Sequence, residues 1–342
     1  MKKHKILYPP TVNWNLLFQR PNQILKVLAR HGYLSYFMNH TPHIKEQFVS
    51  KNIMEIEKNL FIVPLFEDPK KINPNVIYYS YPDHHAFITQ MKPKYNIFDV
   101  IDAPVKEFKG WKRNWFKCIE DADLVMASAK ILYEQAKEHN DNVISVPNGV
   151  EYEHYQGNKR NPYKKLHKQH KGFDPKKPII GFSGAIATWI DLNLLIGASL
   201  KYPEYNFVIM GMEYNVKLKK FPPNLFFIGH KNYAQLPQWI NHMDVCTLPF
   251  IPHTDVANAC NPLKFWEYLA SGNPIVSTAL PETKVDHIYW CESNEEYLES
   301  IPKAVEEKQN GNKNADKRRK IAKKNSWDNC CKPLLEVLEQ WD

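Results

Sequence analysis

The sequence predicts an α/β protein with two doubly wound, parallel-sheet domains of Rossmann-like architecture. Short apolar runs alternate with amphipathic helical patterns along the whole chain. The alternation stops once, within residues 156–177, and then starts again. The 342 residues also suit two hydrophobic cores of about 150 residues each. Strands that alternate with helices are typical of parallel sheets covered on both faces.

The expected strands are short, rich in β-branched and aromatic residues, and bounded by Pro, Gly, Asn or Asp, as buried parallel strands are. In the first half they are residues 6–8, 35–38, 61–63, 76–79, 97–101, 124–127 and 143–146. In the second half they are residues 179–183, 207–210, 225–228, 245–248, 274–278 and 288–291.

The expected helices carry apolar residues at a helical period, and several have recognisable ends. One begins at Pro21 and stops at Gly32, and another follows Ser128, a plausible N-cap. The later ones are residues 189–202, 236–242, 263–271, 294–307, 315–323 and 327–341.

These patterns give domain boundaries. We expect a first domain over residues 1–155, a linker over 156–177 and a second domain over 178–326. The linker is assigned because its residues are dense in Lys, Asn, His and Pro and have no apolar period.

The composition points to a protein of the cytoplasm. No apolar stretch reaches the ~18 residues that a membrane-spanning helix needs. The basic start is followed by a run that stops at Pro9, too short for a signal peptide. The six cysteines form no CxxC pair and no metal-ligand spacing, so we interpret them as reduced thiols.

The formal net charge is +8, and much of the excess is local. Residues 159–177 contain eight Lys or Arg and one acid, and a second basic cluster spans 317–324. Such runs can serve nucleic acid, anionic lipid or a phosphorylated substrate, or can be no more than a solvated face. No helix-turn-helix, zinc-finger or RNA-binding signature accompanies them, so we expect no nucleic acid partner.

The most informative segment is NPLKFWEYLASG, residues 261–272. Asn261 can cap a helix, Pro262 fits its first position and Gly272 can end it. Lys264 then lies in the first turn, where the helix dipole favours an anion such as a diphosphate. Glu267 follows on the same face and suits the hydroxyls of a ribose. The alternative is a surface Lys–Glu pair worth ~0.3 kcal/mol.

This segment resembles the donor-site motif of the large retaining glycosyltransferase family of GT-B fold. The positions that match the motif are Pro262, Lys264, Glu267, Tyr268, Ala270, Gly272, Pro274, Ile275 and Val276. Residues 121–155, 178–211 and 226–250 resemble further segments of the family, in the family's order. Residues 14–33 resemble the branch that includes teichuronic-acid-type transferases of cell-surface polysaccharides.

The resemblance implies a function and a domain arrangement. A sugar would pass, with retention of configuration, from a UDP- or GDP-sugar to a hydroxyl acceptor in the synthesis of cell-surface polysaccharide or glycoconjugate. The first domain would be the acceptor side, the second the nucleotide-sugar donor side, and the two would face a central cleft. The last helix, residues 327–342, would pack back on the first domain.

The resemblance also implies site residues. The donor nucleotide would contact Gly184, Ala185, Asn261, Leu263, Lys264 and Glu267. Lys264 and Asp102 would be the catalytic residues, with Asp102 at the end of a parallel strand, where such sheets bind ligands. As an alternative, Asp102 is a helix cap or loop acid.

Three features depart from the family pattern. Ala259 stands where the family has its first glutamate, which faces the donor sugar; Asp255 or Asn258 is a candidate replacement. The basic residues usual after the first donor-domain strand are missing beyond Gly184, and Arg20 is a candidate for the lost charge. The glycine-rich loop usual after the first strand of the chain is absent too.

Four further residues are candidates for the donor sugar or the acceptor: Trp14, His84, His85 and Asn258. Trp14 is as well suited to core packing as to stacking on a sugar. The two histidines follow a strand end, although surface histidines are commoner than catalytic ones.

We expect no cofactor and no metal, because no acidic pair stands at a strand end with supporting ligands. The expected partners are the nucleotide-sugar, a lipid-linked or polymeric glycan acceptor and, through the basic runs, the anionic inner face of the cell membrane. The alternatives are a nucleotide-sugar epimerase or hydrolase, or a non-catalytic nucleotide-sugar-binding protein.

Overall fold

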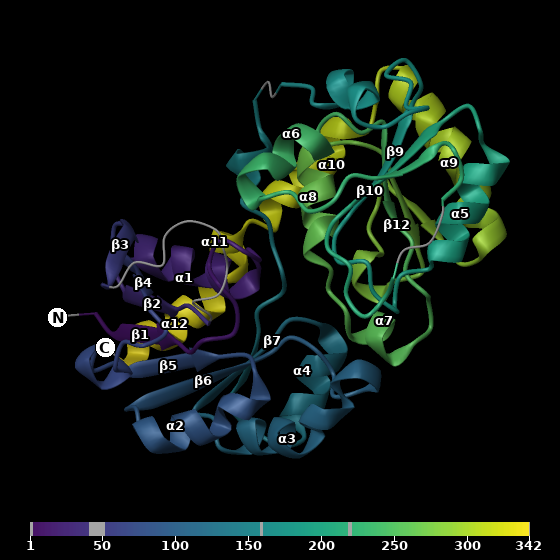
Figure 1. The fold of residues 1–342 in the computed structure, drawn as a ribbon. Helices are drawn as coiled ribbons and strands as arrows, with labels where there is room; N and C mark the ends of the chain where they lie inside the picture. Colours follow the sequence, from purple (N-terminus) through teal and green to yellow (C-terminus); the bar gives the residue numbers. More distant parts are fainter. Residues whose placement is uncertain (1–2, 41–51, 158–159, 218–220, 342) are drawn as a thin grey trace. The chain divides into compact units, whose positions relative to one another are not determined.

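The computed structural model describes residues 3–40, 52–157, 160–217 and 221–341, and the chain divides into two compact units (Figure 1). Unit 1 comprises Met1–Asn148, Ala259–Asn261 and Trp327–Asp342, and unit 2 comprises Gly149–Asn258 and Pro262–Ser326. Each unit is built on a parallel sheet covered by helices, so the predicted fold class is confirmed.

The sheet of unit 1 has eight strands in the order β3-β4-β2-β1-β5-β6-β7-β8. Their bounds are β1 Lys5–Tyr8, β2 Leu34–Met38, β3 Met54–Glu57, β4 Leu60–Val63, β5 Val76–Tyr79, β6 Tyr95–Val100, β7 Leu124–Ala127 and β8 Val143–Ser145. All neighbours are parallel except β3, which pairs antiparallel with β4 at the edge. The central strands are buried, whereas the edge strand β3 is largely exposed.

Helices cover both faces of this sheet. They are α1 Arg20–Arg30, α2 His85–Met91, α3 Lys112–Glu120, α4 Lys130–Lys137, α11 Trp327–Cys330 and α12 Lys332–Trp341. Figure 1 shows α2, α3 and α4 on one face, and α1 with α11 on the other. The last predicted helix is divided in two, and Trp341 near its end stacks on Tyr95 with ring centroids 4.1 Å apart.

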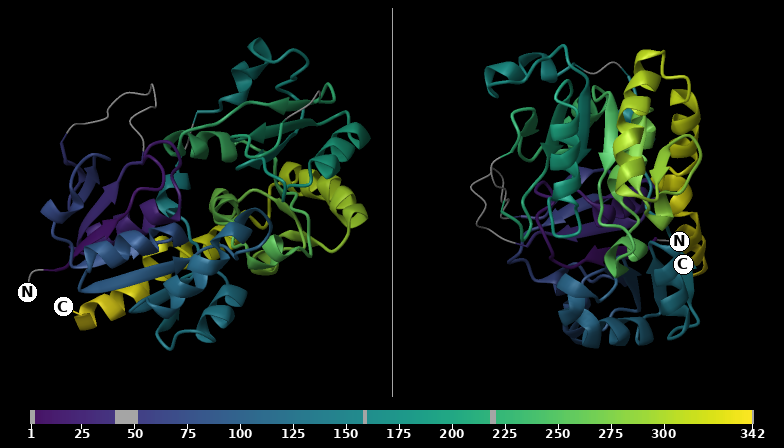
Figure 2. Two further views of the ribbon diagram at one scale, coloured as in Figure 1. Left: turned by 60° about the horizontal axis from the view of Figure 1, so that its bottom comes forward. Right: turned by 90° about the vertical axis from the view of Figure 1, so that its right-hand side faces the viewer.

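The sheet of unit 2 has six parallel strands in the order β11-β10-β9-β12-β13-β14. Their bounds are β9 Ile179–Ser183, β10 Asn206–Met210, β11 Leu225–Phe227, β12 Val245–Leu248, β13 Ile275–Thr278 and β14 Tyr289–Cys291. The helices are α5 Leu192–Lys201, α6 Leu236–Ile240, α7 Asp255–Ala259, α8 Leu263–Ser271, α9 Asn294–Gln309 and α10 Ala315–Lys324. Helices α5 and α9 lie on one face and α6, α8 and α10 on the other; the right-hand view of Figure 2 brings α5 and α9 to the front.

The residues expected to form a linker, 156–177, group with unit 2. A 3₁₀ helix, Tyr163–Lys168, buries Tyr163 and Leu166. The ring of Tyr163 meets that of Trp239 in α6 edge-on, with centroids 5.0 Å apart, and the rings of Phe173 and Phe226 have centroids 5.3 Å apart. Three apolar side chains therefore attach a segment whose other residues are mostly polar.

Within the described ranges, no helix combines the length and the apolar character that crossing a membrane requires.

Candidate functional site

Helix α8 carries the motif residues. Its C-terminal end is as predicted from the sequence, but its N-terminal end is not. Gly272 ends the helix in the left-handed conformation, with φ of 79°. At the other end the N-cap residue is Pro262 rather than Asn261, and it makes no side-chain cap. Asn261 instead groups with unit 1, where its amide donates to the carbonyl of Ser128 at 2.9 Å. Asn261 therefore fixes the chain just before α8 rather than capping it.

Lys264 lies in the first turn of α8, beside the end of β9. Its ammonium is 5.2 Å from the ring centroid of Phe182 and 5.1 Å from that of Phe250, which is the geometry of a cation–π contact. A Cβ atom on Gly184 would lie 2.2 Å from Cε and 2.6 Å from Nζ of Lys264. A glycine is therefore needed at position 184 for the lysine to lie against the loop that follows β9.

Tyr268 connects α8 to the same strand end. Its hydroxyl accepts a hydrogen bond of 2.7 Å from the backbone N–H of Ser183, the last residue of β9. A Cβ atom on Gly211, which follows β10, would lie 1.8 Å from the carbonyl oxygen of Gly184. Two glycines thus allow the ends of β9 and β10 to approach closely, with Lys264 and Tyr268 one helical turn apart along that edge.

Glu267 lies between these two residues in the sequence, and burial raises the pKa of its carboxyl to about 7. The hydroxyl of Tyr155 and the charge of Lys264 act in the opposite direction, toward the ionised form. A half-buried carboxylate one turn into the helix, next to a lysine, supplies strong acceptors for hydroxyl groups, while the lysine and the helix dipole favour an anion. This arrangement is complementary to a nucleoside diphosphate, which has hydroxyl groups on its ribose and negative charge on its diphosphate.

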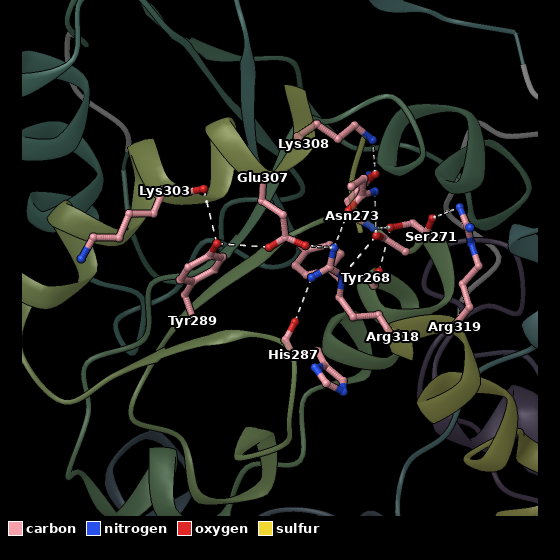
Figure 3. A network of polar contacts seen from close by, with 12 residues as sticks. Tyr268, Ser271, Asn273, His287, Tyr289, Lys303, Glu307, Lys308, Arg318 and Arg319 are labelled. Carbon is pink, nitrogen blue, oxygen red and sulfur yellow. Dashed lines mark hydrogen bonds and ion pairs between the residues drawn. The ribbon is translucent and has the colours of Figure 1, made fainter. Parts of the chain in front are cut away.

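The turn after α8 is held by α9 and α10 (Figure 3). Arg318 is fully buried and donates to the carbonyls of Gly272 at 3.1 Å and His287 at 2.8 Å. It also forms an ion pair of 2.9 Å with Glu307 and contacts the side chain of Asn312. The sequence places Arg318 in a basic surface cluster, which is wrong, because its charge is satisfied inside unit 2.

Unit 1 contains a second buried arginine, Arg20. Its guanidinium donates to both carboxylate oxygens of Asp99, at 2.7 and 2.8 Å, and to the side chain of Asn148 at 3.1 Å. Tyr78 donates to the same carboxylate at 2.7 Å. Asp99 therefore neutralises Arg20 within the unit, and the candidate role of Arg20 toward the donor phosphate stays a prediction. The amide of Asn148 donates in turn to the carbonyl of Asn261.

Asp102 follows β6 in unit 1. Burial raises the pKa of its carboxyl to about 6, and the nearby charge of Asp99 adds to the increase. Its backbone carbonyl accepts a hydrogen bond of 3.2 Å from the indole of Trp115. By solvent accessibility Asp102 is half-buried, so its carboxyl combines partial access to solvent with a raised pKa, and its catalytic role stays a prediction.

The other unit 1 candidates have partners of their own. Trp14 is 7% exposed and meets Phe18 and Phe37 edge-on at 5.4 and 5.2 Å, which is core packing. His84 donates from Nε2 to the carbonyl of Pro10 at 3.1 Å, and burial lowers its pKa to about 4, so it is neutral at pH 7.

The remaining candidates are placed as follows. His85 contacts the carboxylate of Asp121 at 2.7 Å. Asn258 lies in α7 and donates its backbone N–H to Thr254, whereas Ala259, which replaces the family's glutamate, packs in an apolar cluster of unit 1. Ala185 is exposed beyond Gly184, and Leu263 is the first residue of α8.

The structure therefore brings together Gly184, Lys264 and Glu267 in unit 2. Sequence reasoning missed Phe182, Phe250 and Tyr155, which surround them. The signal for the two phenylalanines was available, since they lie in or beside strands whose carboxyl ends form the ligand-binding edge of such sheets. In the part of the chain that the structure describes, no three His, Cys, Asp or Glu side chains are grouped to hold a metal ion.

Two parallel-sheet units, with the motif helix α8 against the strand ends of the second, define the GT-B fold. Solved structures share this fold over nearly their whole length. Anabaena Alr3699/HepE in complex with UDP-glucose is similar with a TM-score of 0.73 at 14% identity, covering 98% of this chain and 100% of that one. Sucrose-phosphate synthase from Thermosynechococcus elongatus is similar with a TM-score of 0.70 at 12% identity, covering 98% and 99%.

At the level of sequence, the chain is similar to TuaH of Bacillus subtilis (strain 168), which is named as a teichuronic acid biosynthesis glycosyltransferase. The two are 27% identical over 230 residues, which cover 63% of this chain. The chain spans just over half, 56%, of the length of that relative. No family model matches the chain.

Proposed function

We propose that the protein is a glycosyltransferase that moves a sugar from a UDP-sugar to a hydroxyl acceptor, with retention of configuration. The observation that carries the proposal is the position of Lys264, in the first turn of α8 against Gly184, with the half-buried Glu267 on the next turn. The similarity to a protein in complex with UDP-glucose supports UDP as the nucleotide.

In this proposal, catalysis depends on positioning and on stabilising the charge of the leaving diphosphate. Lys264 and the N-terminal turn of α8 face the diphosphate oxygens, and Glu267 accepts hydrogen bonds from the ribose hydroxyls. Asp102 contributes from unit 1 by accepting a hydrogen bond from a sugar hydroxyl. The acceptor is a lipid-linked or polymeric glycan, in the synthesis of a cell-surface polysaccharide.

Replacing Lys264 with alanine tests the donor site. The change removes a charge-assisted contact worth ~1.5–3 kcal/mol, so the affinity for UDP measured by calorimetry should fall at least about tenfold. Lys284→Ala is a matched control in the same unit, because this lysine also lies over an aromatic ring, that of Trp290, at 4.4 Å. Equal affinities of both variants and the parent would rule out the assignment.

The raised pKa of Glu267 gives a second test. A carboxyl with a pKa of about 7 is protonated below neutrality, and the protonated form is the weaker acceptor for ribose hydroxyls. UDP affinity should therefore rise as the pH increases through about 7. Glu267→Gln should bind more weakly at high pH and remove that increase. If the pH profile of the variant matches that of the parent, Glu267 has no such role.

We further propose that turnover needs no divalent ion and that the protein works at the inner face of the cell membrane. Activity that is abolished by EDTA and restored by magnesium or manganese would contradict the first statement. The second predicts co-sedimentation with anionic vesicles that weakens steeply as salt rises, since screening acts within ~10 Å at 0.1 M ionic strength.

One observation favours a different function. Ala259 lies in an apolar cluster, so the carboxylate that relatives use toward the donor sugar is missing at that position. A non-catalytic nucleotide-sugar-binding protein would have this feature, and an epimerase or hydrolase is the other alternative. Product analysis after incubation with a panel of nucleotide-sugars, with and without acceptor, separates transfer, hydrolysis, epimerisation and binding alone.

A further inference from the structure

Unit 2 contains a pocket that is separate from the residues around Lys264. Its volume is about 630 Å³, and it is lined by Arg160, Asn161, Pro162, Lys164, Lys165, Gln238 and His242. The charged groups of this lining are three cations, and it includes no carboxylate. Hereafter these residues are called the basic pocket.

The fold gives the basic pocket a fixed base. Tyr163 and Leu166 are buried, whereas Lys164 and Lys165, which lie between them on the 3₁₀ helix, are exposed. Tyr163 packs edge-on against Trp239, next to Gln238 on α6, so the two walls of the pocket are joined through apolar contacts. Lys164 and Lys165 therefore extend into solvent from a helix that is anchored by its buried side chains.

The cations of the pocket have no ion-pair partner among the residues that the structure describes. Arg160, Lys164 and Lys165 form no ion pair with any residue in the described ranges, whereas Arg318, in the other basic run, pairs with Glu307. His242 donates from Nδ1 to the carbonyl of Gln238 at 2.8 Å, which fixes the proton on that nitrogen. The pocket thus gathers three cations that have no carboxylate partner among the described residues of the unit.

We propose that the basic pocket is a second anion site, which binds a ligand bearing two or more phosphate charges. A guanidinium can engage a phosphate through two parallel hydrogen bonds, and two lysines add point charges around it. A pocket of this volume suits a compact group rather than an extended polymer. Such a group can be a soluble polyphosphate or the head of a phospholipid, and the proposal goes beyond the donor site proposed above.

The test compares two triple variants with the same loss of charge. Arg160→Gln/Lys164→Gln/Lys165→Gln removes the cations of the pocket. Lys168→Gln/Lys171→Gln/Lys176→Gln is the control, because these exposed lysines belong to the same basic run but do not line the pocket. Tripolyphosphate is titrated by calorimetry with UDP present at saturation, so that the donor site is filled. A parallel arm measures flotation with vesicles of phosphatidylcholine containing cardiolipin, whose head carries two phosphate groups.

In at least one arm, the pocket variant should bind at least about tenfold more weakly than the parent, while the control variant stays within about threefold. Loss in the tripolyphosphate arm alone identifies a soluble ligand, and loss in the vesicle arm identifies a lipid head. An equal loss in both variants would show a diffuse basic surface and overturn the proposal, as would the absence of parent binding in both arms. A failure of UDP to bind in its own titration counts against the donor site alone, since tripolyphosphate binding to the basic pocket is still compared between the two variants.

Discussion

Each unit buries one arginine, but the two arginines have different partners. Arg20 in unit 1 is 3% exposed and makes both of its ionic hydrogen bonds to one carboxylate, that of Asp99, which is fully buried. Arg318 in unit 2 is equally buried but contacts a single carboxylate oxygen, of Glu307. Its other hydrogen bonds go to two backbone carbonyls and to an amide side chain.

The difference shows two ways to stabilise a buried cation. In unit 1 the buried positive charge is stabilised mainly by one carboxylate, so it depends on one residue. In unit 2 it is stabilised partly by backbone carbonyls, which a side-chain substitution does not remove. Each network includes a residue that is close to α8 in the sequence. The first includes the carbonyl of Asn261, just before the helix, and the second includes the carbonyl of Gly272, just after it. The networks therefore fix the segments on either side of the helix that carries Lys264.

The largest effect is expected for Asp99→Asn. The change leaves the guanidinium of Arg20 buried without an opposite charge, which typically destabilises a protein by ~3–5 kcal/mol. Urea unfolding followed by circular dichroism measures this loss. The double variant Arg20→Met/Asp99→Leu should recover most of it, since neither charge then remains buried. A loss below about 1 kcal/mol would mean that Asp99 is not the main partner of Arg20.

The two buried arginines also show where prediction from sequence stops. Apolar runs predicted the described strands of both sheets apart from one, because buried parallel strands are continuous apolar runs, but helices α2, α3 and α7 were not predicted. The edge strand Met54–Glu57 was missed, because its MEIE pattern lacks such a run. The packing of residues 156–177 was missed too, since three aromatic or apolar anchors among many lysines give no period.

The candidate site was predictable where it depends on a local motif, and less so where it depends on tertiary contacts. Lys264, Glu267 and Gly272 lie on one helix and follow one pattern. The ring partners of Lys264 come from two different strand regions, which no local spacing connects. In the sequence, Arg318 is also indistinguishable from its exposed neighbour Lys317. Only the fold decides which cation is buried and which faces solvent.

A smaller effect is expected for Glu307→Gln. The variant keeps an acceptor oxygen near Arg318, and the two backbone carbonyls remain in place. We expect a loss of ~1.5–3 kcal/mol, the range for one hydrogen bond to a charged group. Urea unfolding beside Asp99→Asn gives a direct comparison of the two networks. A loss of stability equal to or larger than that of Asp99→Asn would contradict the view that the two backbone carbonyls help to stabilise the charge of Arg318.

The smallest effect is expected for Arg319→Gln, which replaces the direct neighbour of Arg318 on α10. Arg319 is 37% exposed and pairs with Asp316, which is 96% exposed, and it donates to the carbonyl of Ser271 at 3.0 Å. Exposed pairs of this kind contribute about 0.2–1 kcal/mol, because water screens them and the side chains lose entropy. Urea midpoints should therefore shift slightly at low salt, and less in 1 M salt. A shift as large as that of Glu307→Gln would contradict this expectation. It would mean that the hydrogen bond to Ser271 at the end of α8, and not burial of the guanidinium, determines how much an arginine adds to the free energy of unfolding.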